Sequence, residues 1–205
     1  MTAELPAALV TGATSGIGRA TAVQLVRNGW KVFAVGRRRN NLESLATDCQ
    51  DLSGLLIPVA ADVTDDASVT ALYDTVEAQG GVDTVLNIAG GAVGAEPLAA
   101  ADLADWEWMI DTNVLGSLRV IKQFLPMLRA HGAGTILNLT STAGVVAYEG
   151  GAGYNAAKFG QHAMTGALRL EEAEHNIRVI EVLPGLVKTD EFALKRMRGD
   201  ASKAA

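Results

Sequence analysis

The sequence predicts an α/β protein with a doubly wound parallel sheet, folded as a single domain over residues 1–205. Short apolar segments alternate with amphipathic helical segments along the chain, which is typical of a parallel sheet covered by helices on both faces. No linker-like segment interrupts this alternation, and 205 residues is a usual length for one domain. Right-handed crossovers would then wind the sheet in two directions from its first strand. The alternative is an α/β fold with a different winding.

Six apolar segments are expected to form the strands, each bounded by turn residues or by the start of a helical segment. Gly12 closes the first strand, and Pro184 and Gly185 close the last. The expected strands are 7–10, 31–35, 55–60, 82–88, 134–139 and 177–183.

The segments between the strands have the apolar spacing of helices. Asn28 and Gly29 form a C-terminal stop for the first helix, and acidic residues open the third. The fourth helix is expected to break or bend near Gly116 and near Pro126, whose ring removes a backbone donor. The expected helices are 17–28, 40–49, 65–78, 101–129 and 154–174, and 195–205 is expected to be a solvated tail.

Composition excludes several classes of function. The formal net charge of -6 argues against a nucleic-acid partner, which would need a basic face. Cys49 is the one cysteine, so an intrachain disulfide and a Cys-rich metal site are excluded, and we expect Cys49 to pack in the core. The three histidines have no carboxylate or cysteine at ligand spacing, so no metal site is expected. No apolar run is long enough for a membrane helix and no signal-like N-terminus is visible, which predicts a cytoplasmic protein without a membrane partner.

A glycine-rich segment, TGATSGIG at 11–18, follows the first expected strand and opens the first helix. Gly12 would allow a sharp turn, Gly16 a close approach of the backbone to a pyrophosphate, and Gly18 tight packing of helix on strand. The helix start offers free N–H groups and a partial positive charge to phosphates. The spacing is G-x-x-x-G-x-G rather than G-x-G-x-x-G, and at this place in the fold it indicates a dinucleotide site.

This segment resembles the cofactor signature of the short-chain dehydrogenase/reductase family, and further motifs of that family follow in the same order. Residues 87–90 (NIAG) are similar to its N-N-A-G segment, with Ile88 as a departure, and residues 154–158 (YNAAK) match its Y-x-x-x-K. Asn113, Ser141, Pro184-Gly185 and Thr189 fall at the family's positions, so that the resemblance covers roughly residues 7–190. Members usually continue through further helices and a seventh strand, so we expect the C-terminal part of that Rossmann-type fold to be missing here. The chain would then be truncated, incompletely resolved or naturally short.

The resemblance and the glycine turn together give the expected cofactor-binding residues. They are Gly12, Thr14, Ser15, Gly16, Ile17, Gly18, Arg37, Arg38, Asp62, Val63, Asn87, Ala89, Gly90, Tyr154, Lys158, Pro184, Gly185, Val187 and Thr189.

Tyr154 and Lys158 form the centre of the expected catalytic site. They are four residues apart on an expected helix, so their side chains share one face. An ammonium group beside a phenol favours the phenolate, which makes Tyr154 a plausible general acid for ketone reduction and general base for alcohol oxidation. Ser141 would donate a hydrogen bond to the substrate oxygen. By resemblance, Asn113 would hold a relay water, and Lys158 would bind the ribose hydroxyls. A lone Y-x-x-x-K on a helix is usually a surface pair, which is the alternative here. The order of Asn113, Ser141, Tyr154 and Lys158 after a glycine turn favours a catalytic site instead.

The residues after the second expected strand predict NADP(H) rather than NAD(H). The position where NAD users usually carry an acid holds Gly36, and Arg37 and Arg38 could clamp a ribose phosphate. The alternative is a solvated arginine cluster at a helix start. By resemblance Asp62 and Val63 border the adenine, although Asp62 could instead cap the following turn.

The sequence therefore predicts an NADP(H)-dependent oxidoreductase that interconverts a small carbonyl compound and a secondary alcohol. Val145, Tyr148, Leu186 and Val187 are expected to line the substrate pocket. Trp106 and Trp108 are expected to anchor their helix on a neighbour, with a place at the pocket rim as the alternative. Small residues along 154–167, together with the resemblance, predict a homodimer or homotetramer. The alternative function is a non-catalytic NADP(H)-binding regulator or scaffold; an epimerase or dehydratase on the same site would need a longer chain.

Overall fold

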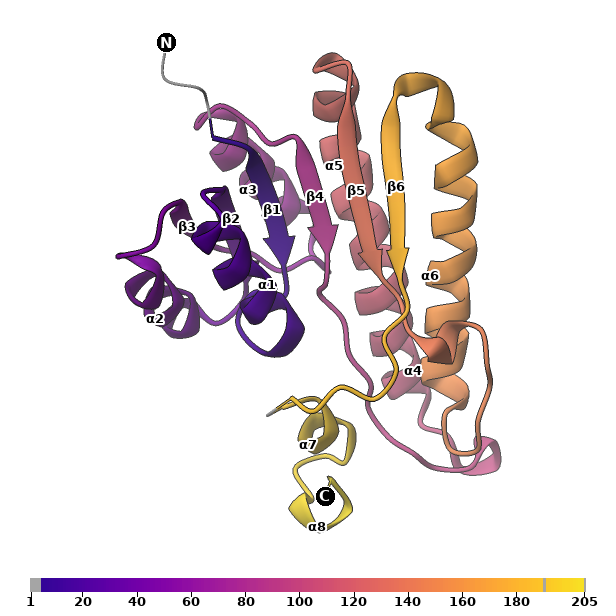
Figure 1. Ribbon diagram of the computed structural model, residues 1–205. Helices are drawn as coiled ribbons and strands as arrows, with labels where there is room; N and C mark the ends of the chain where they lie inside the picture. The colour runs from indigo at the N-terminus through magenta and orange to yellow at the C-terminus, as the bar shows by residue number, and fades with distance from the viewer. Residues whose placement is uncertain (1–4, 190, 205) are drawn as a thin grey trace.

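The computed structural model describes residues 5–189 and 191–204, and its centre is a parallel sheet in the order β3-β2-β1-β4-β5-β6 (Figure 1). The chain winds outward from β1 in both directions, which confirms the doubly wound fold. The strands are β1 (Ala7–Thr11), β2 (Lys31–Gly36), β3 (Leu55–Ala60), β4 (Thr84–Asn87), β5 (Gly134–Leu139) and β6 (Ile177–Val182).

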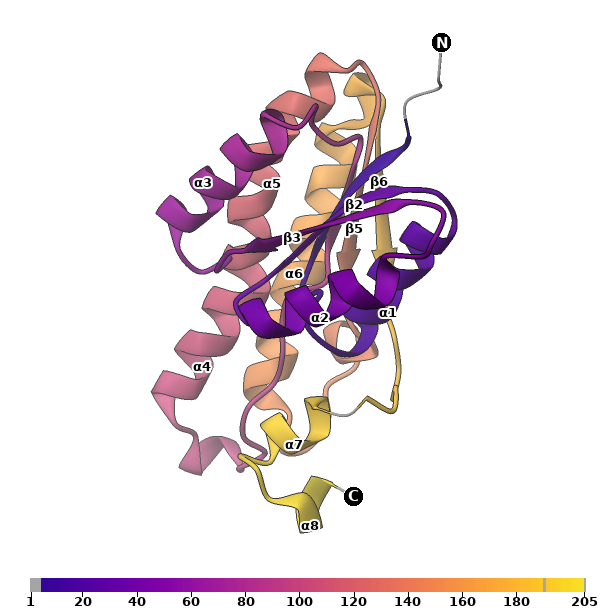
Figure 2. The ribbon, with the colours of Figure 1, turned by 90° about the vertical axis from the view of Figure 1, so that its left-hand side faces the viewer.

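Helices lie on both sides of this sheet, as Figure 2 shows from the side. Core residues of α1 and α2 pack on one face, and core residues of α3, α5 and α6 pack on the other. The α-helices are α1 (Gly16–Arg27), α2 (Arg39–Cys49), α3 (Asp66–Glu77), α4 (Leu103–Ile110), α5 (Gly116–Ala130), α6 (Ala152–Glu171), α7 (Phe192–Arg196) and α8 (Ala201–Ala204). Short helical turns are η1 (Leu98–Ala100), η2 (Asp111–Leu115), η3 (Thr142–Gly144) and η4 (Ala173–His175).

The strand β1 shows why the sequence has unbroken apolar runs instead of alternating ones. Ala8 and Val10 point toward α1 and α2, whereas Leu9 points toward the opposite helix layer, and all three are 0% exposed. A strand covered on both faces needs apolar side chains at every position. Cys49 is buried in the α1–α2 layer, as expected.

The expected helix 101–129 is three consecutive elements, α4, η2 and α5. Its break is the π-helix η2, which ends directly before Gly116. Pro126 does not end α5, although its ring removes one backbone donor. Pro126 and Lys122, whose carbonyl loses that donor, are both exposed, so water can satisfy the carbonyl. Among the described residues, no helix is long and apolar enough to cross a membrane.

Candidate active site

The carboxyl ends of β1 and β4 are joined at one edge of the sheet, where a doubly wound fold binds its ligand. The Thr11 hydroxyl donates to the Leu86 carbonyl (3.3 Å) and accepts from the backbone N–H groups of Ile88 and Ala89, both at 3.0 Å. Gly12 has a φ of +71°, and a Cβ there would lie 2.8 Å from the Ala89 nitrogen. The first turn thus requires glycine because the end of β4 packs directly against it.

The rest of the glycine turn leaves the start of α1 accessible. Gly16 has a φ of +50°, and a Cβ on it would meet Thr189 at 3.3 Å, so Thr189 lies directly over the turn. A Cβ on Gly18 would lie 2.2 Å from the Gly12 carbonyl oxygen. Ser15 begins α1 without a side-chain cap. The first N–H groups of the helix are therefore available to an anion, which fits the pyrophosphate of a dinucleotide.

The Arg38 side chain binds the polar side chains of the glycine turn. Its guanidinium donates to the hydroxyls of Thr14 (2.9 Å) and Ser15 (3.0 Å) and to the Glu191 carboxylate (2.8 Å). A Cβ on Gly36 would lie 2.5 Å from the Thr14 methyl, so even a small side chain would collide at the position where NAD users carry an acid. Two hydroxyls and a guanidinium at a helix start suit a phosphate group.

Asp62, Val63 and Arg37 lie beside the arginine cluster. Asp62 accepts hydrogen bonds from the backbone N–H (3.0 Å) and hydroxyl (2.8 Å) of Thr64, which is the turn-capping alternative, and Arg37 approaches it to 3.6 Å. These hydrogen bonds and Arg37 lower the pKa of the Asp62 carboxyl, although burial alone would raise it. Val63 packs against α5, where a Cβ on Gly116 would lie 2.9 Å from the valine methyl.

Asn87 ends β4, and Gly90 lies in the loop that follows it, next to Asn113 and Lys158. The Asn87 amide donates to the Asn138 side-chain oxygen (3.0 Å), while its own Oδ1 is buried without a hydrogen-bond partner. A Cβ on Gly90 would lie 2.5 Å from the Asn113 side-chain oxygen. The Asn113 side chain donates to the carbonyls of Gly91 (2.9 Å) and Met109 (2.8 Å) and accepts from the Gly91 N–H (3.1 Å). It therefore fixes the loop after β4.

Ser141 and Tyr154 meet across the space between η3 and α6. The Ser141 hydroxyl lies close enough to the phenol to lower its pKa, and its oxygen accepts a hydrogen bond from the Ala143 N–H (3.1 Å). Burial raises the pKa of Tyr154, and the Ser141 hydroxyl and the charge of Arg196 offset only part of that rise. Phe192 of α7 covers the tyrosine ring edge-on, with ring centroids 5.9 Å apart.

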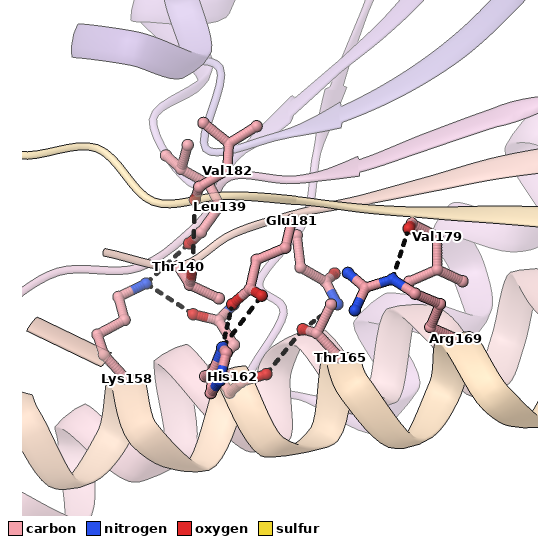
Figure 3. Close-up of polar contacts among 11 residues, drawn as sticks. Leu139, Thr140, Lys158, His162, Thr165, Arg169, Val179, Glu181 and Val182 are labelled. Carbon is pink, nitrogen blue, oxygen red and sulfur yellow. Dashed lines mark hydrogen bonds and ion pairs between the residues drawn. The ribbon is translucent and has the colours of Figure 1, made fainter. Parts of the chain in front are cut away.

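Lys158 is 4% exposed and lies one turn after Tyr154, with its amine 5.8 Å from the centre of the tyrosine ring. Nζ donates to the Leu139 carbonyl (2.9 Å) and to the Gln161 side-chain oxygen (2.7 Å). Figure 3 shows the lysine directed from α6 toward Leu139. Burial lowers the pKa of Lys158 to about 7. The lysine therefore loses charge near neutral pH.

A shallow cleft, open to solvent, lies beside Tyr154, between α4 and the start of α6. Trp106 lines this cleft and also packs against α6, where a Cβ on Gly153 would lie 3.0 Å from its indole nitrogen. Trp108 lies outside it, under the amine of Lys195 at 4.0 Å. The expected pocket residues Val145, Tyr148, Leu186 and Val187 do not line the cleft and are exposed on loops. The cleft residues are Val93, Gly94, Glu96, Leu98, Ala101, Asp102, Asp105, Trp106, Met109, Gly150, Gly151, Ala152, Gly153 and Tyr154.

Arg196 of α7 brings a positive charge to the edge of this region. Its guanidinium donates to the Tyr148 hydroxyl (2.9 Å) and the Gly150 carbonyl (3.3 Å), and it lies over the Tyr148 ring. Its Nε is buried without a hydrogen-bond partner. Sequence reasoning missed Arg196 and Glu191 because nothing in the sequence shows that α7 folds back over the site.

The histidines do not assemble a metal centre in the part of the chain that the structure describes, where no group of three or more candidate ligands gathers. His162 instead binds the Glu181 carboxylate through Nδ1, at 2.9 and 3.0 Å (Figure 3). Ile17 lies in the first turn of α1, and Pro184, Gly185 and Val187 lie in the loop after β6. The Pro184 carbonyl accepts a hydrogen bond from the Thr142 N–H (3.1 Å).

Comparison with known proteins places the chain in a family. The family model described as "short chain dehydrogenase" matches residues 6–198. An uncharacterized oxidoreductase of Mycobacterium tuberculosis is 48% identical over 197 residues, which cover 96% of this chain and 75% of that protein. The NADP-dependent 3-hydroxy acid dehydrogenase of Salmonella typhimurium is 38% identical over 197 residues, which cover 96% of this chain and 78% of that protein.

Among solved structures, the closed form of serine dehydrogenase complexed with NADP+ is similar to this chain with a TM-score of 0.90 and 36% identity, covering 97% of this chain and 79% of that one. The chain thus spans about three quarters of the length of these relatives. With the parallel sheet, the glycine turn and the matched residues in agreement, the chain belongs to the short-chain dehydrogenase family of oxidoreductases.

Proposed function

We propose that this protein interconverts a small carbonyl compound and a secondary alcohol with NADP(H), using Tyr154 as the general acid and base. The observation that carries the proposal is that the Ser141 hydroxyl acts on Tyr154, while the Lys158 amine lies 5.8 Å from the centre of the tyrosine ring. These groups lie at the carboxyl edge of the sheet, where the glycine turn also opens.

The nicotinamide, when bound, supplies the hydride for carbonyl reduction and accepts it in alcohol oxidation. Ser141 and Tyr154 would both contact the substrate oxygen: Ser141 orients it, and the Tyr154 hydroxyl delivers its proton during reduction and takes it back during oxidation. Lys158 and Arg196 place positive charge near the phenol and stabilise the phenolate after proton transfer. Phe192 covers the tyrosine ring and limits the access of water.

NADP(H) is preferred over NAD(H) because of the arrangement around Arg38. Arg38, Thr14 and Ser15 together offer a guanidinium and two hydroxyls to a ribose phosphate, and Gly36 leaves no acid to repel it. The relatives described as NADP-dependent, and the related structure in complex with NADP+, support this assignment.

The substrate is proposed to carry an anionic group near the reacting carbon. Arg196 supports this because its charge acts on Tyr154 and its buried Nε has no partner. The relatives include a 3-hydroxy acid dehydrogenase and a serine dehydrogenase. Both names refer to compounds that carry a carboxylate on the same short carbon chain as the alcohol. Nothing in these relatives favours the alternative of a non-catalytic regulator or scaffold.

Replacing Tyr154 with Phe tests the proposal. We expect turnover of 3-hydroxy acids with NADP+ to fall by about three orders of magnitude or more, because the proton carrier is lost while the ring packing remains. NADPH binding, followed by fluorescence titration, should stay within a few-fold. Tyr73→Phe is the matched control, since Tyr73 lies on α3 and its hydroxyl donates to Glu77. Retained turnover in Tyr154→Phe would remove Tyr154 from its assigned role.

We also propose that residues 1–205 form one domain, located in the cytoplasm, that assembles as a homodimer or homotetramer through α5 and α6. Leu118, Phe159 and Leu170 are exposed apolar side chains on these two helices and support such an interface. Light scattering should give at least twice the chain mass of 21.3 kDa. A monomer at micromolar concentration would refute the assembly.

A further inference from the structure

A glutamine buried inside the catalytic helix is the polar group that the proposed reaction leaves unexplained. Gln161 lies on α6, three residues beyond Lys158, and is 0% exposed. Burial of an amide costs free energy unless both of its ends are hydrogen-bonded. Both ends of the Gln161 amide are hydrogen-bonded: Oε1 accepts from Lys158 Nζ at 2.7 Å, and Nε2 donates to the Ser117 hydroxyl oxygen at 2.9 Å.

The direction of this amide is set by the chain of bonds behind it. The Ser117 hydroxyl has one proton, which it donates to the backbone carbonyl of Asn113 at 3.0 Å. Ser117 can therefore only accept from Gln161, so the NH2 end faces Ser117 and the oxygen faces Lys158. Asn113 belongs to the π-helix η2, which thus supplies the last acceptor of the chain.

We infer that Gln161 is a positioning residue that favours the protonated form of Lys158 and holds its amine beside the Tyr154 ring; the inference rests on the proposed function of that site. Gln161 supplies the one side-chain acceptor bonded to the lysine amine among the described residues, and the second acceptor is the Leu139 carbonyl. Acceptors aimed at the amine stabilise the ammonium over the neutral amine.

The surroundings of Lys158 make such an acceptor necessary. Burial is the cause that lowers the pKa of Lys158 to about 7, and no charged group offsets it. On α6 the nearby titratable group is Tyr154, and from β5 the lysine meets the Leu139 carbonyl. The uncharged Asn113 side chain of η2 flanks the same glycine, Gly90, as the lysine amine. On β6, Glu181 is bound by His162. Without Gln161, the amine would lose its proton at lower pH and would favour the phenolate less.

Gln161→Met tests this, because methionine has a similar length and cannot accept from the amine. Lysine labelled with 13C at Cε reports the Lys158 titration directly by NMR in the protein without cofactor, with Lys158→Arg used to assign the signal. We expect the pKa of Lys158 to fall by at least about one unit, because a hydrogen bond to a charged group is lost. The rise of kcat/KM for alcohol oxidation should move to higher pH, because the phenolate loses its charged neighbour.

Thr165→Val is the matched control, one turn further along the same buried face. Thr165 is 0% exposed; its hydroxyl accepts from Asn138 and donates to the backbone carbonyl of Gln161 at 2.7 Å (Figure 3). Its loss therefore removes buried hydrogen bonds next to Gln161 but keeps the side-chain acceptor on Lys158. Both variants should lose stability in thermal unfolding, but only Gln161→Met should shift the lysine titration. If Gln161→Met does not fold, Gln161→Glu provides the opposite test, since a carboxylate there should raise the pKa of Lys158.

An unchanged lysine titration in Gln161→Met, or a lower lysine pKa in Gln161→Glu, would overturn the inference and leave Gln161 as a core-filling residue. This outcome is independent of the assignment of Tyr154, which fails only if Tyr154→Phe keeps its turnover.

Discussion

Glu191 accepts a hydrogen bond from Arg38 at 2.8 Å, and this contact joins the segment before α7 to the glycine turn. The same guanidinium donates to Thr14 and Ser15. Arg38 lowers the pKa of Glu191, so the carboxylate is charged at neutral pH. A carboxylate thus lies at the group of donors that we assign to the ribose phosphate, and the two anions would compete for Arg38.

Glu191→Gln should therefore tighten NADPH binding. Removing the competing charge releases Arg38 from an exposed ion pair, which is worth up to about 1 kcal/mol, so the dissociation constant should fall by about two- to fivefold. NADH has no phosphate at this position, and its binding should change little. Fluorescence titration with both cofactors measures the difference, and equal changes for NADPH and NADH would contradict the competition.

Arg38→Ala should weaken NADPH binding by about tenfold to a hundredfold, because charge-assisted hydrogen bonds to the phosphate are lost. NADH binding should stay within about threefold, so the preference for NADP(H) would largely disappear. Arg39→Ala removes the same charge from the next residue, which begins α2, and serves as the control. Similar losses in both variants would mean that the cluster acts only through its net charge.

Arg196→Met should separate anionic from neutral substrates. For a 3-hydroxy acid, kcat/KM with NADP+ should fall by about tenfold to a hundredfold, since one charge-assisted contact is removed. For a neutral secondary alcohol of the same length, the change should be much smaller. Arg178→Met is the control, because Arg178 lies on β6 and donates to Thr135, away from the cleft. Equal losses on both substrates would assign Arg196 to packing on Tyr148 instead.

The sequence predicted the sheet and its strands closely, because a doubly wound sheet requires continuous apolar strands and these are visible as runs of residues. The break in the helix around Gly116 was expected, but its form, the π-helix η2, was not. Its function follows from the structure, since η2 holds the Asn113 carbonyl that anchors Ser117. Spacing along a helix does not reveal where one residue is inserted.

The sequence by itself determined the order of strands and helices along the chain, the glycine turn at residues 12–18 and the pairing of Tyr154 with Lys158. Each of these depends on residues that are close together along the chain. The tertiary structure decided which distant groups act on them. Arg38 meets Glu191 across 153 residues, and Gln161 meets Ser117 across 44. Neither contact leaves a local pattern, because each forms only when separate helices and loops converge at the carboxyl edge of the sheet.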